Sequence, residues 1–241
     1  VNTRIVVAPA IDFGAVRTEF ALDEHYPAPA ITEARTASDR NARTRVDRTD
    51  LPLVTIDPPG SMDLDQAVHL ERTADGGFVV HYAIADVYSV VEPGGAVDTE
   101  SHRRGQTFYL PDGSVPLHPR ELAEGTASLL PGVDRPAALW RMELDDAAEP
   151  VAVTVQRALV RSVARLDYAG VQADADAGTL HPSIAALPDF GRVRAAAARA
   201  RGAIELRLPE QDVVADGDGW SLRIEPRTAA DDWNAYVDHA F

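Results

Sequence analysis

Short apolar runs, each ended by turn-forming residues, fill the chain between residues 51 and 91. Asp75-Gly76-Gly77 lies between the apolar runs at 67–71 and 78–84. Two β-prone runs separated by an Asp-Gly turn are typical of a β-hairpin. The pattern therefore predicts antiparallel strands in this part of the chain.

Two further pairs of apolar runs follow. Residues 140–144 and 151–163 form a second β-rich pair. Residues 211–214 and 220–224 flank the turn sequence Asp216-Gly-Asp-Gly219. That turn lacks the ligand spacing and the final glutamate of a calcium loop, so we interpret it as a hairpin turn.

Three segments have helical character instead. Polar residues are frequent in the short helix expected at 96–105, and another helix begins at Gly170 and ends near Gly178. Alanine-rich residues 190–201 favour a third, because alanine has the highest helix propensity. The predicted fold class is α+β, with a mixed, mostly antiparallel sheet and flanking helices.

Composition restricts the class of protein. The chain has 241 residues, of which 45% are hydrophobic and 25% charged, as in a globular protein. It contains no cysteine, which excludes disulfides and thiolate metal sites. No apolar run is long enough for a bilayer, and no secretory signal pattern is present. We expect a cytoplasmic protein with no membrane partner.

The strongest chemical signal is a cluster of three aspartates. Asp57, Asp63 and Asp65 lie within nine residues, directly after the β-prone run 53–56. Hard cations such as Mg²⁺ prefer carboxylate oxygens, and a cation would offset the repulsion. If the chain is extended, Asp63 and Asp65 share one face, and the intervening turn could fold Asp57 back against them. Asp, Pro and Gly are also ordinary turn residues, so the alternative interpretation of this segment is a solvated acidic turn.

The sequence from Asp57 to Asp65, Asp-Pro-Pro-Gly-Ser-Met-Asp-Leu-Asp, resembles the catalytic aspartate motif of the ribonuclease II / ribonuclease R (RNB) family. Other segments resemble that family in the same order, over residues 46–170: 81–87, 103–111, 115–119, 127–131 and 160–168. The resemblance implies an RNB-like catalytic domain at 46–241, present only as its N-terminal portion. Residues 1–45 are then an N-terminal extension, with a strand-like start at Ile5–Val7.

The resemblance implies a hydrolytic exoribonuclease that degrades single-stranded RNA from its 3′ end and releases nucleoside 5′-monophosphates, with Mg²⁺ or Mn²⁺ as cofactor. Two cations about 4 Å apart can neutralise a phosphodiester and activate a water. Carried over by position, the resemblance makes Asp57, Asp63 and Asp65 metal ligands, and loss of Asp65 would abolish cleavage. The sequence contains no Gly-rich phosphate loop, so we expect no nucleotide cofactor. The oligomeric state is not predicted.

Two tyrosines are candidate RNA-binding residues by the same resemblance. Tyr109 matches the residue that helps set the length of the end product, and Tyr168 matches the one that stacks near the 3′-terminal base. Stacking tolerates any base, as a non-specific nuclease requires. From the residues alone, Tyr109 could instead be a buried core tyrosine and Tyr168 an anchor between a strand and a helix.

Two features weigh against activity. Gln66 stands where the family commonly has a fourth aspartate, so this position offers a metal ligand without charge. The net charge of −15 disfavours long-range attraction of RNA. Gln66 and the missing part of the domain favour the alternative hypothesis, a catalytically incompetent RNB-like domain that acts as an RNA-binding or regulatory module.

Overall fold

The computed structural model describes residues 7–8, 11–204, 206 and 208–238. The chain divides into two compact units, each built from three segments. One comprises residues 1–36, 91–121 and 206–227, and the other 37–90, 122–205 and 228–241. The predicted boundary between residues 45 and 46 concerns the family domain, and it stays a prediction.

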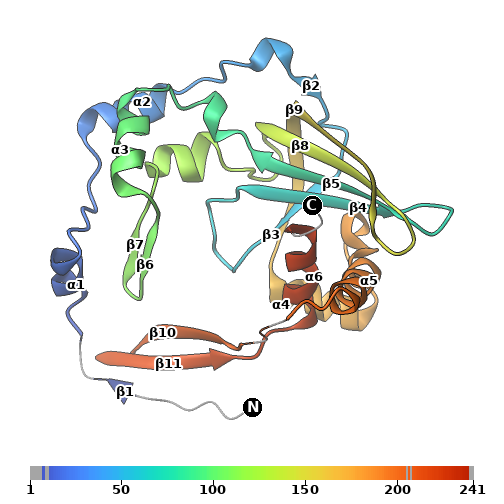
Figure 1. The fold of residues 1–241 in the computed structure, drawn as a ribbon. Coiled ribbons are helices and arrows are strands. Elements are labelled where there is room, and N and C mark those ends of the chain that lie inside the picture. The colour runs from blue at the N-terminus through green and yellow to red at the C-terminus, as the bar shows by residue number, and fades with distance from the viewer. Residues whose placement is uncertain (1–6, 9–10, 205, 207, 239–241) are drawn as a thin grey trace. The chain divides into compact units, whose positions relative to one another are not determined.

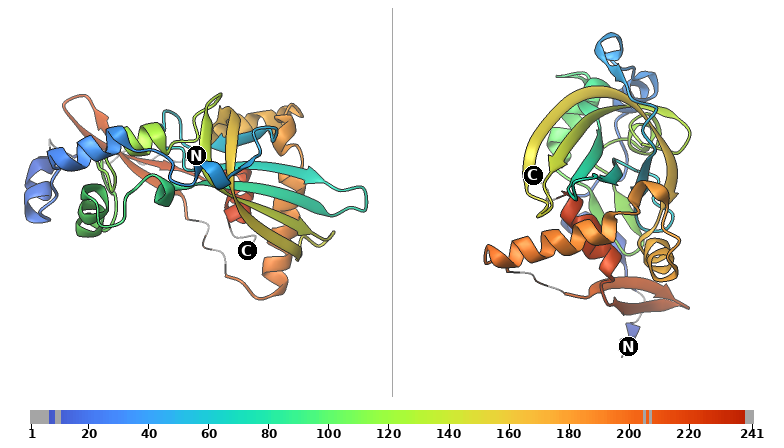
Figure 2. Two further views of the ribbon diagram at one scale, coloured as in Figure 1. Left: turned by 90° about the horizontal axis from the view of Figure 1, so that it is seen from above. Right: turned by 90° about the vertical axis from the view of Figure 1, so that its right-hand side faces the viewer.

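The larger unit contains a sheet in the order β2-β9-β3-β4-β5-β8. Its strands are β2 (Val46–Asp47), β3 (Leu53–Ile56), β4 (Gln66–Arg72), β5 (Phe78–Ala85), β8 (Asp134–Leu144) and β9 (Pro150–Leu166). β9 pairs with β8 along most of its 17 residues, and its last residues also pair with β3. This double pairing closes the sheet, and the curved strands are visible in Figure 2.

The predicted strand pairs in this unit are confirmed. β4 and β5 form the antiparallel hairpin expected around the Asp-Gly turn, and β8 and β9 are also antiparallel. β9 runs parallel to β2 and β3, so the sheet is mixed and mostly antiparallel, as expected. The parallel pairing joins segments about 110 residues apart, as with Val54 and Ala164, and local sequence patterns do not reveal it.

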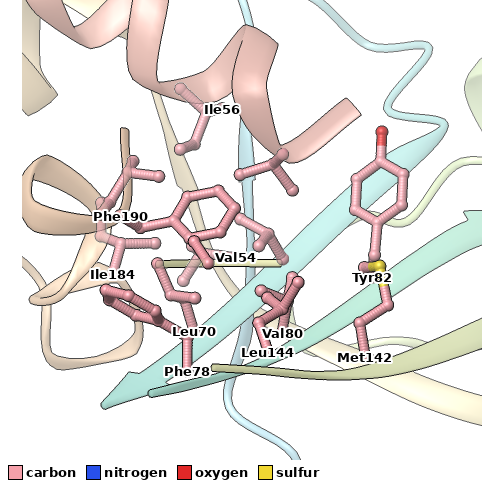
Figure 3. Packing of buried hydrophobic residues seen from close by; sticks show 14 of the residues in the cluster. Val54, Ile56, Leu70, Phe78, Val80, Tyr82, Met142, Leu144, Ile184 and Phe190 are labelled. Atoms are coloured by element: carbon pink, nitrogen blue, oxygen red, sulfur yellow. The ribbon is translucent and has the colours of Figure 1, made fainter. Parts of the chain in front are cut away.

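Alternating side chains on the strands fill two separate cores. Val68 and Leu70 of β4 belong to a large cluster that includes Phe78, Met142 and Phe190 (Figure 3). Three helices contribute to this cluster: α4 (Tyr168–Ala177), α5 (Leu187–Ala200) and α6 (Ala229–Asp238). The second core is rich in small residues and is formed by Leu51, Leu53, Ala67, Ala83, Ala85, Leu129, Ala137, Leu139, Ala158 and Val160. Small side chains suit the interior of a tightly closed sheet.

Short helical turns and capping residues complete this unit. The turns are η1 (Ala42–Thr44), η2 (Val87–Ser89), η3 (Leu122–Thr126) and η4 (Pro182–Ile184). Helix α4 begins two residues before its predicted start, because the Asp167 side chain caps it by accepting a hydrogen bond from the amide of Gly170. It ends as expected at Gly178, which has the left-handed conformation that favours glycine.

In its described residues, the smaller unit contains three helices and two small sheets (Figure 1). The helices are α1 (Phe13–Glu19), α2 (Ala28–Thr36) and α3 (Ala96–Arg104), and the strands are β1 (Val7–Ala8), β6 (Phe108–Leu110), β7 (Gly113–Val115), β10 (Glu210–Asp216) and β11 (Gly219–Glu225). The predicted β10–β11 hairpin is confirmed, and β1 pairs with β11. Val7 lies in β1, whereas Ile5 and Val6 of the expected strand lie outside the described residues. In the described part of the chain, no helix is long and apolar enough to cross a membrane.

Candidate functional site

The aspartate motif connects two adjacent strands of the closed sheet. Asp57 directly follows β3, and Asp65 directly precedes β4. Because β3 and β4 are antiparallel neighbours, with Val54 opposite Val68, the end of one lies beside the start of the other. The sheet therefore returns Asp65 to the neighbourhood of Asp57, as the sequence analysis anticipated.

A buried leucine holds the connecting loop in place. Leu64 is fully buried between the exposed Asp63 and Asp65. Its amide donates to Ser128 Oγ at 3.1 Å, and its carbonyl accepts from the amide of Leu129 at 2.7 Å. Since alternate residues of an extended chain point in opposite directions, burial of Leu64 turns both aspartates outward. The motif is therefore fixed by its packing and not only by its turn residues.

A cavity of about 200 Å³ opens at this end of the strands. Its polar lining consists of Asp57, Asp65, Gln66, Tyr82, Tyr168 and Asn234. Its apolar lining consists of Val54, Ile56, Ala67 and Val68. The structure thus brings together four predicted site residues, Asp57, Asp65, Gln66 and Tyr168. Asp63 does not line this cavity.

The electrostatics of the cavity centre on Asp57. Burial is the main factor that raises the pKa of Asp57 to about 6, and the negative charges of Asp65 and Asp63 raise it further. The positive charge of Arg165 opposes this shift. Arg165 also donates a hydrogen bond to the carbonyl of Ser61 at 3.0 Å, so it supports the loop as well. A divalent cation would relieve the repulsion from Asp65 and Asp63 that adds to this shift.

The donor set fits a hard cation only in part. Asp57 and Asp65 supply carboxylate oxygens at one cavity, which is the chemistry that Mg²⁺ and Mn²⁺ prefer. Among the described residues, however, no three histidine, aspartate or glutamate side chains are arranged so that they could hold a metal ion. Two of the residues expected as ligands therefore fit a cation at this cavity, while the full set is not assembled.

Two polar residues of the cavity were missed by the sequence analysis. Tyr82 on β5 donates a hydrogen bond to the side-chain oxygen of Gln66. Asn234 on α6 donates from Nδ2 to the hydroxyl of Tyr168 at 3.4 Å. Tyr82 could have been found from the hairpin register, which places it diagonally across from Gln66. No sequence signal points to Asn234, because tertiary packing alone brings α6 to the cavity.

The two predicted RNA-binding tyrosines have different surroundings. Tyr168 is the first residue of α4, packs partly against the large core and lines the cavity. Tyr109 lies on β6 in the smaller unit and is 78% exposed. The competing interpretation of Tyr109 as a buried core residue is therefore wrong. Its role toward RNA stays a prediction.

The mostly antiparallel closed sheet with flanking helices is a fold found among solved structures. The structure of Mycoplasma genitalium RNase R in complex with ribose-methylated single-stranded RNA superposes with a TM-score of 0.85 at 23% identity. The match covers 93% of this chain and 37% of that one. This likeness confirms the predicted fold.

The RNB domain family model matches residues 45–232, and the chain belongs to this family. It is 34% identical over 190 residues to ribonuclease R of Vibrio parahaemolyticus, covering 76% of this chain and 23% of the relative. It is 33% identical over 211 residues to ribonuclease R of Acidithiobacillus ferrooxidans, covering 83% of this chain and 48% of the relative. The chain thus spans less than half of the length of these relatives.

Proposed function

We propose that this chain is part of a metal-dependent 3′-to-5′ exoribonuclease that hydrolyses single-stranded RNA and releases nucleoside 5′-monophosphates. The observation that carries the proposal is the cavity in which Asp57 and Asp65 meet Tyr168 in a chain of the RNB family. Two solved structures support RNA as the substrate. They are of the Mycoplasma genitalium relative, in complex with single-stranded and with double-stranded RNA. An RNA-degrading role also accords with a cytoplasmic location.

The residues that line the cavity fall into two functional groups, one for the cation and one for the RNA. Asp57 and Asp65 would hold Mg²⁺ or Mn²⁺, and Asp63 lies next to them on the loop as a further candidate ligand. When bound, such a cation neutralises charge on the phosphodiester and lowers the pKa of a bound water. Tyr168 presents an aromatic ring on which an RNA base can stack whatever its identity.

Cleavage of 5′-labelled single-stranded RNA by the purified chain, with Mg²⁺ and with EDTA, tests the proposal. We expect a ladder that shortens from the 3′ end only in the presence of the cation. Asp65→Asn should abolish the ladder, and Asp218→Asn, in the turn between β10 and β11, is the matched control that should retain it. Circular dichroism verifies that each variant folds. Internal cleavage, or cleavage that persists in Asp65→Asn, would contradict the proposal.

The occupant of the fourth motif position favours a second candidate function. Gln66 carries no charge, and its side-chain oxygen already accepts a hydrogen bond from Tyr82. A site with fewer carboxylates holds divalent cations more weakly. A chain that binds RNA without cleaving it, with equal affinity in wild type and in Asp65→Asn, would establish a non-catalytic RNA-binding module instead.

A further inference from the structure

Gln66 and Tyr82 form a pair on one face of the β4–β5 hairpin. The register places Val68 opposite Tyr82 and Gln66 opposite Ile84, so Gln66 and Tyr82 are diagonal neighbours. Long side chains at such positions reach each other. The Tyr82 hydroxyl donates to Gln66 Oε1, and both residues line the cavity that contains Asp57 and Asp65.

The tyrosine is held firmly, so it can fix the orientation of the glutamine. Tyr82 is 4% exposed and belongs to the large hydrophobic core. Figure 3 shows its hydroxyl directed away from the side chain of Met142. Gln66 is exposed at the start of β4 and has several rotatable bonds. The hydrogen bond therefore orders the mobile partner on the rigid one.

An amide with its oxygen engaged offers its nitrogen on the other side. A glutamine side chain has one carbonyl oxygen and an NH₂ group with two donors. Within the described part of the chain, Gln66 Nε2 makes no hydrogen bond. Since the oxygen is turned to Tyr82, the two N–H groups remain for a ligand in the cavity. Such groups repel a cation and attract an anionic oxygen.

We infer that Tyr82 is a positioning residue that withdraws Gln66 from metal coordination and makes it a hydrogen-bond donor to a phosphate oxygen of the RNA backbone. The inference rests on the proposed function for the nature of the ligand. It differs from the role expected for Gln66, which the resemblance placed among the metal ligands. The cavity then combines a cation-binding side, at Asp57 and Asp65, with an anion-binding side at Gln66.

Three variants separate the two roles of Gln66. Gln66→Met keeps the length of the side chain and removes its polar atoms. Gln66→Glu keeps an acceptor for Tyr82 but replaces the donors by a negative charge. Tyr82→Phe keeps the buried ring and removes only the hydroxyl. Tyr88→Phe is the matched control, because Tyr88 is 64% exposed and does not line the cavity.

The first measurement is the binding of Mn²⁺ in the absence of RNA. Electron paramagnetic resonance of the free ion detects it. We expect the Mn²⁺ affinity of Gln66→Met and Tyr82→Phe to stay within 2-fold of wild type, and that of Gln66→Glu to increase about 10-fold. A loss of about 5-fold or more in both neutral variants would overturn the inference. It would mean that Gln66 is a metal ligand supported by Tyr82.

Binding of fluorescein-labelled single-stranded RNA in EDTA, measured by anisotropy, is the second measurement. A hydrogen bond to a charged oxygen predicts a loss of about 10-fold in Gln66→Met, at least as much in Gln66→Glu, and about 3-fold in Tyr82→Phe. Unchanged RNA affinity in Gln66→Met, or no RNA binding by wild type, would exclude the donor role. Thermal unfolding of each variant verifies that it is folded.

The cleavage assay described above keeps this inference separate from the proposed function. If wild type cleaves RNA while Gln66→Met binds it normally, the inference fails and the proposed function stands. If wild type cleaves nothing while Gln66→Met binds RNA more weakly, the exonuclease function fails and the phosphate-binding role stands.

Discussion

Two groups of ionisable side chains, one beside the start of the β4–β5 hairpin and one in its middle, have different surroundings. At the start of β4, Asp65 and Gln66 open into a cavity together with Asp57. In the middle of the hairpin, His69 and His81 lie opposite each other and stack with ring centroids 5.9 Å apart. Both histidines are 6% exposed, so this second group is closed to solvent.

Burial acts in opposite directions on the two groups. It raises the pKa of Asp57 to about 6 and lowers the pKa of His81 to about 4, since the charged form is disfavoured in both. His69 is tied into the fold, because its Nε2 lies 2.6 Å from a Glu71 oxygen and its Nδ1 lies 3.3 Å from the carbonyl of Ser183. Asp57 and Asp65 instead line a cavity. A shifted pKa therefore marks burial in both groups, and only access to solvent distinguishes a candidate site from a structural cluster.

The largest expected difference between the two groups is in activity. Asp65→Asn should reduce metal-dependent RNA cleavage by about 100-fold or more, as does removal of a group that stabilises transition-state charge. His81→Gln should leave the cleavage rate within about 3-fold of wild type, because the histidine pair is closed to substrate. Initial rates with labelled RNA at saturating Mg²⁺ measure both. Comparable losses in the two folded variants would remove the distinction.

Affinity for RNA should depend on the aromatic side chain beside the aspartates. Tyr168→Ala should weaken binding of single-stranded RNA by about 10-fold, since stacking contributes about 1–3 kcal/mol per base. Tyr168→Phe keeps the ring and should bind within about 2-fold of wild type. Anisotropy titrations in EDTA provide the measurement. Equal losses in both variants would point to the hydroxyl, which contacts Asn234, and not to stacking.

The histidine group should produce the larger dependence of stability on pH. The folded pKa of His81 lies near 4, below its ordinary value of 6.5, so the unfolded chain takes up a proton first as the pH falls. The stability that depends on neutral His81 is fully present above pH 6.5 and is lost as the pH falls from 6.5 to 4. Allowing for solvent screening, we expect the decrease in the free energy of unfolding at low pH to be smaller by about 2 kcal/mol in His81→Gln than in wild type. Urea unfolding of wild type and variant at pH 7 and 4.5 measures it, and parallel pH dependences would refute the assignment.

Asp57 should have a smaller effect of the opposite sign. Its folded pKa of about 6 exceeds its ordinary value of 3.8, so the folded state keeps a proton that the unfolded chain releases, and stability falls as the pH rises from 4 to 6. In EDTA, Asp57→Asn should be more stable than wild type by about 1 kcal/mol at pH 7, after allowance for screening, with no gain below pH 4. Urea unfolding in EDTA tests this. A variant that is less stable at pH 7 would show that the charge of Asp57 is satisfied.

Much of the local structure followed from the sequence because its causes are local. Turn residues and β-prone runs predicted the β4–β5 and β10–β11 hairpins, and residue content predicted α3, α4 and α5 to within a few residues. The other three helices of the described chain, α1, α2 and α6, were not predicted. The clustering of Asp57, Asp63 and Asp65 after a strand likewise pointed to the position of the candidate site.

The tertiary structure decided what depends on contacts between distant segments. Closure of the sheet requires β9 to pair with both β8 and β3, and the hydrophobic pattern of a strand does not name its partners. Packing of α6 on the core brings Asn234 to Tyr168. The hydroxyl of Tyr82 on β5 donates a hydrogen bond to the side-chain oxygen of Gln66. The sequence by itself thus determined which residue types are available and where the hairpins and the helices α3, α4 and α5 form. Which of them meet, and whether an amide offers its oxygen or its nitrogen, was decided by packing, because the hydrogen bonds that orient side chains form only between segments the fold has already brought together.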